Sequence, residues 1–196
     1  MATRQRTRVK TRDRMVLAAI ELMRERGSAG VTIDAILSRS EAPRGSVYYH
    51  FPGGRNQIIA EALEVASDAI SSLIDSAVTD GPLTGLGKMR DFWSSVLISS
   101  DFQAGCPVVS VVAGGGEDSE QHADAVTDTF RRWKAALAAG LTAEGIAISR
   151  AESLAVLTIA AFEGAIIMCR AERSLRPLEE TISELEQVLA AALPAA

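Results

Sequence analysis

The residues best suited to chemistry lie close together between positions 43 and 50. Arg44 offers a planar fork of donors, Ser46 a hydroxyl group, and Tyr48 and Tyr49 two phenolic hydroxyls. Such groups bind phosphate oxygens and base edges, and an arginine can bind guanine through two parallel hydrogen bonds. The alternative interpretation is a solvated amphipathic helix whose tyrosines pack into a core. Tyr48 can do both, since its ring can be anchored while its hydroxyl reaches a phosphate.

Two short helices and a tight turn are expected to position these groups. Thr32 is a suitable N-cap for a helix that runs to about Arg39. A three-residue turn at 40–42 separates it from a further helix, which Pro43 opens and which ends near Tyr49. This layout predicts a helix-turn-helix, in which the second helix enters the major groove of DNA.

Charge is distributed unevenly along the 196 residues. Residues 1–55 contain 11 Lys and Arg against 5 Asp and Glu, a net charge of +6, whereas residues 56–196 carry −11. The overall charge of −5 alone disfavours a polyanionic partner, so we expect only the basic N-terminal part to meet double-stranded DNA. Residues 1–10 predict a basic arm, which is either solvated or in contact with DNA.

Apolar residues recur at three- and four-residue spacing along most of the chain, and no alternating strand pattern competes. Hydrophobic residues make up 47% of the sequence and aromatic residues only 5%, a composition that suits packed helices. We therefore predict an all-α fold, with a three-helix DNA-binding domain at 1–54 and a larger helical domain at 55–196. About nine helices are expected, at residues 11–26, 33–39, 43–49, 55–77, 84–99, 105–113, 118–143, 149–171 and 177–192.

Several classes of protein are disfavoured. Two histidines and two cysteines, without a phosphate-binding loop or a GxSxG motif, predict neither an enzyme nor a cofactor. The acids around His122 are interpreted as partners of a helix dipole and not as metal ligands. Cys106 and Cys169 are interpreted as small buried hydrophobic residues. Because the chain has no apolar run of about 18 residues, we expect a cytoplasmic protein without a membrane span.

The stretch Pro43-Arg44-Gly45-Ser46-Val47-Tyr48-Tyr49-His50-Phe51-Pro52 resembles the most specific motif of the TetR/AcrR family of bacterial regulators. Residues 51–54, 105–108 and 173–178 are similar to its LmrA/YxaF-type branch of drug-responsive repressors. The resemblance implies a repressor that binds a palindromic operator as a homodimer. It also implies release by a small hydrophobic or aromatic inducer, with an efflux gene as a candidate target.

The resemblance further implies roles for individual residues of the DNA-binding part. Thr32 and Tyr49 would contact phosphate, whereas Phe51 is more simply a core residue. Two positions depart from the family, because Glu41 stands in the turn where glycine is usual and Arg55 replaces a usual lysine. The expected DNA-binding residues are Thr32, Pro43, Arg44, Gly45, Ser46, Tyr48, Tyr49, His50 and Arg55.

The last two expected helices, 149–171 and 177–192, carry apolar stripes with small residues that permit close helix approach. A palindromic operator requires two DNA-binding domains to be held together. We therefore interpret these stripes as a four-helix dimer interface. Ordinary core packing within one chain is the alternative. The expected interface residues are Leu154, Leu157, Thr158, Ala161, Ala165, Ile182, Leu185 and Leu189.

Aromatic residues of the larger domain provide candidates for an effector site, since apolar cavities between helices often bind small molecules. Plain core packing is the alternative for the same side chains. A helix-turn-helix regulator whose C-terminal domain binds a protein partner is the alternative function. The expected ligand-binding residues are Phe92, Trp93, Val96, Cys106, Val109, Phe130, Trp133 and Phe162.

Overall fold

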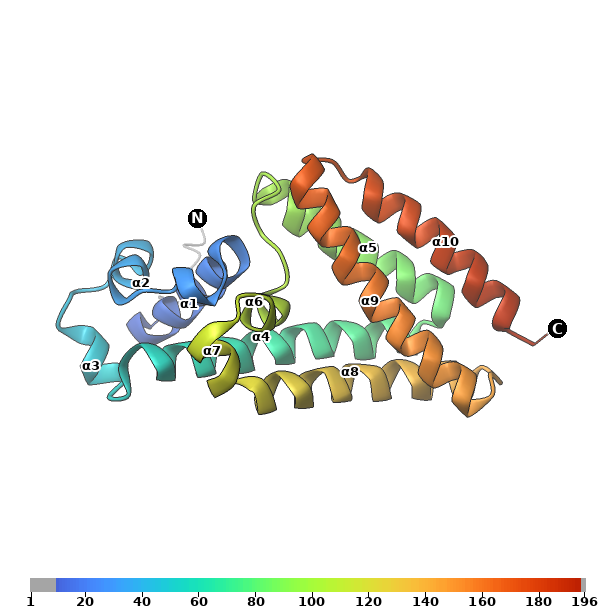
Figure 1. Cartoon of the computed structure of the whole chain (residues 1–196), viewed down its shortest axis with the longest axis horizontal. Coiled ribbons are helices and arrows are strands. Elements are labelled where there is room, and N and C mark those ends of the chain that lie inside the picture. The colour runs from blue at the N-terminus through green and yellow to red at the C-terminus, as the bar shows by residue number, and fades with distance from the viewer. Residues whose placement is uncertain (1–9, 195–196) are drawn as a thin grey trace, which may run out of the picture.

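Figure 1 shows the computed structural model of the chain, which describes residues 10–194. Every regular element over this range is a helix, which confirms the predicted all-α fold. Of the expected basic arm, only Lys10 lies in this range. Residues 10–194 form ten α-helices, against about nine predicted, and one 3₁₀ helix: α1 (Thr11–Arg26), η1 (Ser28–Gly30), α2 (Ile33–Ser40), α3 (Ser46–His50), α4 (Gly54–Thr79), α5 (Pro82–Ser99), α6 (Pro107–Ala113), α7 (Gly116–Gln121), α8 (Ala123–Ala143), α9 (Ile148–Glu172) and α10 (Arg176–Ala192).

Two helices differ from the sequence expectation. α3 begins at Ser46 instead of Pro43, because the Pro43 carbonyl accepts hydrogen bonds from both the backbone N–H and the hydroxyl of Ser46, which closes a turn. The helix expected at 118–143 is two helices, α7 and α8, which meet at His122. The His122 side chain is buried, and its backbone departs from helical geometry at φ −110° and ψ 10°. The chain therefore bends before it enters α8.

The first three helices form a small head around one end of α4 (Figure 1). Met15 and Met23 of α1, Ile36 of α2, and Ile58 and Ile59 of α4 are all completely buried in the common core. Spacings of three and four residues place each apolar stripe on the side that meets its neighbours. The start of α4 is thus a structural part of the head.

The remaining length of α4 belongs to a body of long helices (Figure 1). There α4 packs against α5 and α8, α9 packs against α8 and α10, and α10 also contacts α5. Glycine permits one close approach, because a Cβ at Gly140 of α8 would lie 2.5 Å from the Val78 side chain of α4. The head and the body therefore share a single helix.

Among the described residues, α9 is the one helix long and apolar enough to cross a membrane, with a mean hydropathy of 1.8. Of that apolar window, 39% is buried inside the protein. The apolar composition has two sources: one face of α9 packs on α8 and α10, and another face carries exposed apolar side chains.

Candidate nucleic-acid interface and ligand cavity

The α2–turn–α3 segment is held by its helix caps. Thr32 caps α2, because its Oγ1 accepts a hydrogen bond from the Ala35 backbone N–H at 3.1 Å. At the other end Glu41 has left-handed geometry, with φ 51° and ψ 37°, and the Ala42 N–H donates to the Leu37 carbonyl at 3.2 Å. The turn therefore holds a side chain in a conformation that favours glycine.

α3 turns apolar residues inward and polar residues outward. Val47 and Phe51 are fully buried, as predicted for Phe51. In contrast, Tyr48 and Tyr49 are 67% and 82% exposed, and the Arg44 side chain is 86% exposed. The two phenols and the guanidinium are therefore available to a partner.

An ion pair relates the start of α3 to the start of α2. Arg44 Nη2 lies 3.1 Å from Asp34 Oδ1, and both side chains are largely exposed, so the pair is weak and easily replaced by a phosphate or a base. It places the first turn of α2, which Thr32 caps, beside the residues before α3. Exposed or half-buried positions near these two helix starts and along α3 include Thr32, Pro43, Arg44, Gly45, Ser46, Tyr48, Tyr49 and His50.

Arg55 is used inside the chain, contrary to the expectation that it contacts DNA. Its guanidinium donates to both carboxylate oxygens of Asp118, at 2.6 and 2.7 Å, and to the carbonyls of Ser28 and Val31, at 2.8 and 2.6 Å. The hydrogen bond from Arg55 lowers the pKa of Asp118, which is only 11% exposed. This Arg55–Asp118 clamp joins α7 to the head.

The body also touches the end of α1. The Gly105 backbone N–H donates to the Arg24 carbonyl at 2.8 Å, and Arg170 of α9 donates to the Glu25 carbonyl at 3.3 Å. These carbonyls belong to the last turn of α1, where backbone acceptors have no partner within the helix. Together with the clamp, they couple the head to α6, α7 and α9.

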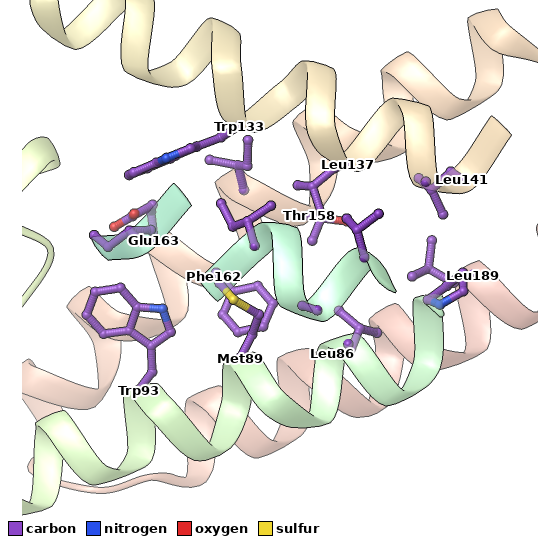
Figure 2. Close-up of a pocket in the computed structure, with 18 residues that line it drawn as sticks. Leu86, Met89, Trp93, Trp133, Leu137, Leu141, Thr158, Phe162, Glu163 and Leu189 are labelled. Carbon is purple, nitrogen blue, oxygen red and sulfur yellow. The ribbon is translucent and has the colours of Figure 1, made fainter. Parts of the chain in front are cut away.

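A narrow cavity of about 70 Å³, open to solvent at its mouth, lies between the helices of the body (Figure 2). Its wall includes Trp93 of α5, Trp133 of α8 and Phe162 of α9, three of the eight residues expected to bind a ligand. α4 contributes much of the remaining wall, which sequence reasoning did not single out. Further lining residues are Ile70, Ile74, Ala77, Val78, Leu86, Met89, Leu137, Leu141, Thr158, Ile159, Glu163 and Leu189.

The other five expected ligand-binding residues lie outside the wall of this cavity. Phe92 packs edge-on against Trp93, with 5.2 Å between ring centroids, and Phe130 packs in the same way against Trp133 at 5.5 Å. Successive helix residues point about 100° apart, so Phe92, which directly precedes Trp93, supports the wall from behind. The five residues are Phe92, Val96, Cys106, Val109 and Phe130.

Two polar groups distinguish one end of the cavity. The Trp133 indole N–H donates to the Ser71 hydroxyl at 2.9 Å, and Ser71 donates to the Ser67 carbonyl, which fixes the ring against α4. Nearby, Glu163 of α9 faces the cavity (Figure 2). Burial raises the pKa of Glu163 to about 7, and its contact with the Cys106 thiol opposes that rise only in part.

Of the eight residues expected at the dimer interface, six are buried within this chain, and the interface itself stays a prediction. These six serve the contacts of α9 with α8 and α10 and of α10 with α5. Leu157, at 44% exposure, and half-buried Ala161 are the exceptions. The six buried residues are Leu154, Thr158, Ala165, Ile182, Leu185 and Leu189.

α9 nevertheless has an exposed apolar face on a different side. Val156, Leu157, Ile167 and Met168 are 51%, 44%, 55% and 51% exposed. Their spacing places them along one strip, and Gly164 lies between the two pairs with open space where a Cβ would be. This exposed α9 face comprises Val156, Leu157, Ala160, Gly164, Ile167 and Met168.

Both parts of the chain match known proteins. Residues 16–62 match the bacterial regulatory proteins of the tetR family, and residues 82–184 match the C-terminal domain described as transcriptional regulator LmrA/YxaF-like. An uncharacterized HTH-type transcriptional regulator of Mycobacterium tuberculosis is 41% identical over 188 residues, which cover 93% of this chain and 96% of that protein.

Solved structures share the fold. Regulatory protein TetR from Rhodobacter sphaeroides superposes with a TM-score of 0.81 at 22% identity, over 90% of this chain and 97% of that one. The regulator CifR, in complex with a 26-base-pair operator DNA, superposes with a TM-score of 0.71 at 20% identity, over 93% and 96%.

The molecule is thus a helix-turn-helix transcriptional regulator that binds DNA, and its relatives are regulators and not enzymes. More particularly, the chain belongs to the TetR family, and its C-terminal domain is of the LmrA/YxaF-like type. The resemblance read from residues 43–52 is thereby confirmed. The domain boundary after residue 54 stays a prediction, because α4 runs without a break from the head into the body.

Proposed function

We propose that this protein is a ligand-responsive repressor. It binds a palindromic operator as a homodimer and leaves it when a small hydrophobic or aromatic compound enters the cavity. The observation that carries this proposal is the course of α4. Ile58 and Ile59 lie in the core of the head, whereas Ile70 and Ile74 of the same helix line the cavity. Since a packed helix shifts as a unit, a ligand that displaces α4 also moves the head.

The outward residues of α3 and the turn before it supply the DNA contacts in this proposal. Tyr49 and Thr32 bind phosphate, and Arg44 releases Asp34 to reach a base or the backbone. His50, edge-on to Tyr49 at 4.9 Å between ring centroids, positions that phenol. Gly45 is exposed and permits close approach to the groove.

The substitution Arg44→Ala tests this interface. We expect a loss of roughly 1–3 kcal/mol in operator binding, with one base preference relaxed if Arg44 binds guanine. Fluorescence anisotropy with operator fragments that differ at single positions measures both quantities. Arg150→Ala, at an exposed site at the start of α9, is the matched control. A uniform loss over all sequences assigns Arg44 to phosphate, and no loss excludes it from the interface.

The exposed α9 face supplies the dimer interface. Two copies of α9 can cross at Gly164, where the lack of a side chain permits close approach, with the pairs at 156–157 and 167–168 on either side. Such a face is complementary to itself, as a twofold interface requires. Dimerisation then pairs two heads on half-sites about 34–36 Å apart.

The substitution Ile167→Glu tests the dimer. A carboxylate in a buried interface is strongly unfavourable, so sedimentation velocity should show a monomer and operator affinity should fall more than about 100-fold. Ile98→Glu is the matched control, since Ile98 is 61% exposed on α5, outside this face. A variant that stays dimeric would remove α9 from the interface.

Tryptophan fluorescence tests effector binding. The chain has two tryptophans, Trp93 and Trp133, and both line the cavity. Hydrophobic compounds that quench this fluorescence and also release the operator support a small-molecule effector. Insensitivity to a broad panel favours the alternative, in which the body binds a protein partner.

The proposal extends to the setting of the regulator. We expect it to act in the cytoplasm, where it has access to the chromosome, and to control an efflux gene. Sequencing DNA fragments captured by the purified protein tests both the palindrome and the target. A shared inverted repeat beside a transporter gene is the expected result, and fragments without any common sequence contradict operator binding.

A further inference from the structure

The cavity contains one group that its apolar walls do not explain. Among the described residues that line it, Glu163 is the only one whose side chain can carry a charge. The other polar groups there are largely committed within the protein. The Trp133 N–H is bonded to Ser71, and the Thr158 hydroxyl donates to the Leu154 carbonyl at 2.8 Å.

Two aromatic rings flank this carboxyl group. In Figure 2, Glu163 lies between Trp133 of α8 and Trp93 of α5 at one end of the cavity. The indole faces carry partial negative charge, and the ionised carboxylate carries a full one. This end of the cavity therefore presents two π-systems and one acid to any occupant.

Glu163 has no cationic partner among the residues that the structure describes. Over residues 10–194, its one notable polar neighbour is the Cys106 thiol, a weak donor whose own pKa is raised well above its usual value by burial. Glu163 is half-buried, and a partly desolvated carboxylate without a cation is destabilised until an opposite charge arrives. An occupant that carries a positive charge would satisfy the group.

We infer that the effector is an apolar, ring-bearing cation, such as a protonated amine, whose charge lies against Glu163 between Trp93 and Trp133 while its rings occupy the remaining apolar cavity. This inference rests on the proposed function and specifies its ligand class. The carboxylate supplies an ion pair, and the indoles supply cation–π contacts to a charge within about 6 Å of their rings. The apolar walls contributed by Ile70, Ile74 and Leu86 hold the rings.

Acidic effectors are disfavoured by the same geometry. A carboxylate or phosphate placed beside Glu163 would meet a like charge in a desolvated site. Residues 56–196 also carry a net charge of −11, which repels anions and attracts cations to the body. An acidic compound that binds more tightly than a basic one of equal size would contradict the inference.

The test uses two probes of equal shape on the full-length dimer: naphthylmethylamine, which is protonated near neutral pH, and its uncharged isostere naphthylmethanol. Isothermal titration at pH 8 gives both dissociation constants for the wild-type protein, for Glu163→Gln and for Glu144→Gln. Glu144 is an exposed acid at the end of α8 and serves as the control. We expect the wild-type protein to prefer the amine at least tenfold, and this ratio to fall toward one only in Glu163→Gln.

The outcomes separate the inference from the proposed function. If the wild-type protein binds both probes equally, or if Glu163→Gln keeps the preference, the inference is wrong although the cavity still binds ligands. If neither probe binds although an uncharged or acidic compound releases the operator, the inference is also wrong. If no small molecule releases the operator, the proposed effector response itself fails. The wild-type ratio decides the matter even if Glu163→Gln does not fold.

Discussion

The two ends of α4 meet opposite surroundings. At the first end lies the head, where Arg44 and Tyr49 extend polar groups into solvent from short helices. At the other end lies the cavity, where Ile70 and Ile74 face a space that holds a single ionisable group, Glu163. In the head, the charged group of Arg44 is exposed to solvent, so its desolvation carries little free-energy penalty. In the cavity wall, by contrast, Glu163 is the one ionisable side chain among the described residues, and burial raises its pKa.

This difference shows how one helix can connect two kinds of recognition. A polyanion is bound by exposed donors whose pairs with neighbours, such as Arg44 with Asp34, contribute little and break easily. In the cavity, burial destabilises the Glu163 carboxylate. A small molecule with a positive charge is therefore selected, because it offsets this unfavourable free energy when it binds. DNA binding by the head therefore depends on exposed charged side chains. Effector binding by the body depends on a carboxyl group that has no partner of opposite charge among the described residues.

The largest expected effect comes from comparing the buried aromatic residue that follows α3 with an exposed one within it. Phe51→Ala should lower the free energy of unfolding by about 3–5 kcal/mol, because it empties a fully buried site in the head. Tyr49→Ala, at a ring that is 82% exposed, should change stability by less than about 0.5 kcal/mol while weakening operator binding. Urea denaturation followed by circular dichroism measures both. Equal losses in the two variants would contradict the inward and outward assignment.

The clamp between the two regions should give the next effect. Asp118→Asn leaves the Arg55 guanidinium, which is 29% exposed, without its carboxylate and should cost about 1.5–3 kcal/mol. Because Arg55 lowers the pKa of Asp118, the clamp's contribution is present above the usual pKa of an aspartate and is lost as the pH falls through the lowered value.

The control for the clamp is an exposed ion pair of the body. Asp68→Asn breaks the pair between Asp68, which is 65% exposed, and Arg132, which is 52% exposed. This substitution should lower the free energy of unfolding by less than about 1 kcal/mol. Thermal unfolding of both variants at pH 7 measures the difference. If the two substitutions cost the same, the clamp is an ordinary surface pair and does not couple the head to the body.

Glu163 should show the reverse dependence on pH. Its pKa is raised to about 7, so the folded protein holds this proton more tightly than the unfolded chain, and stability falls as the pH rises from about 4.5 through 7. Glu163→Gln removes this loss and should stabilise the unliganded protein by on the order of 2 kcal/mol at pH 8 and by little at pH 4. Melting temperatures across this range test it, and a constant difference would contradict it.

The head was the more predictable of the two regions. The residues from Pro43 to Phe51 combine a specific motif with a clear inward and outward pattern, so the fold and the exposed set follow from the sequence. The ion pair of Arg55 was not foreseen, because its partner Asp118 is distant in the chain. Such a contact depends on how α7 packs on the head, and local spacing does not reveal it.

The body was harder to predict because an apolar stripe does not say what covers it. Leu154 and Leu185 suit a dimer interface as well as a core, and only the packing of α9 and α10 shows that they are buried. Some signals were nevertheless present. Glu163 is the one acid between Glu152 and Glu172 of an apolar helix, which marks it as exceptional. Cys106 is buried as predicted, although it lies outside the cavity wall.

The smallest effect compares two helix ends, one in each region. Glu41 ends α2 in the head and Arg173 ends α9 in the body, and both have left-handed geometry, with φ 51° and 52°. Glycine at either site relieves a steric cost of about 1–2 kcal/mol but adds freedom to the unfolded chain, for a net gain of about 0.5–1 kcal/mol.

The two glycine variants should differ in DNA binding. Glu41→Gly removes a negative charge beside α3 and should raise operator affinity a few-fold, most strongly at low salt, because exposed charges are screened over about 10 Å at 0.1 M. Arg173→Gly lies in the body and should leave operator affinity unchanged. Salt titrations of both variants against one operator fragment measure the contrast. An equal response of the two variants would show that the position of the charge does not affect operator binding. A response confined to Glu41→Gly would place the turn close enough to DNA for its charge to affect affinity.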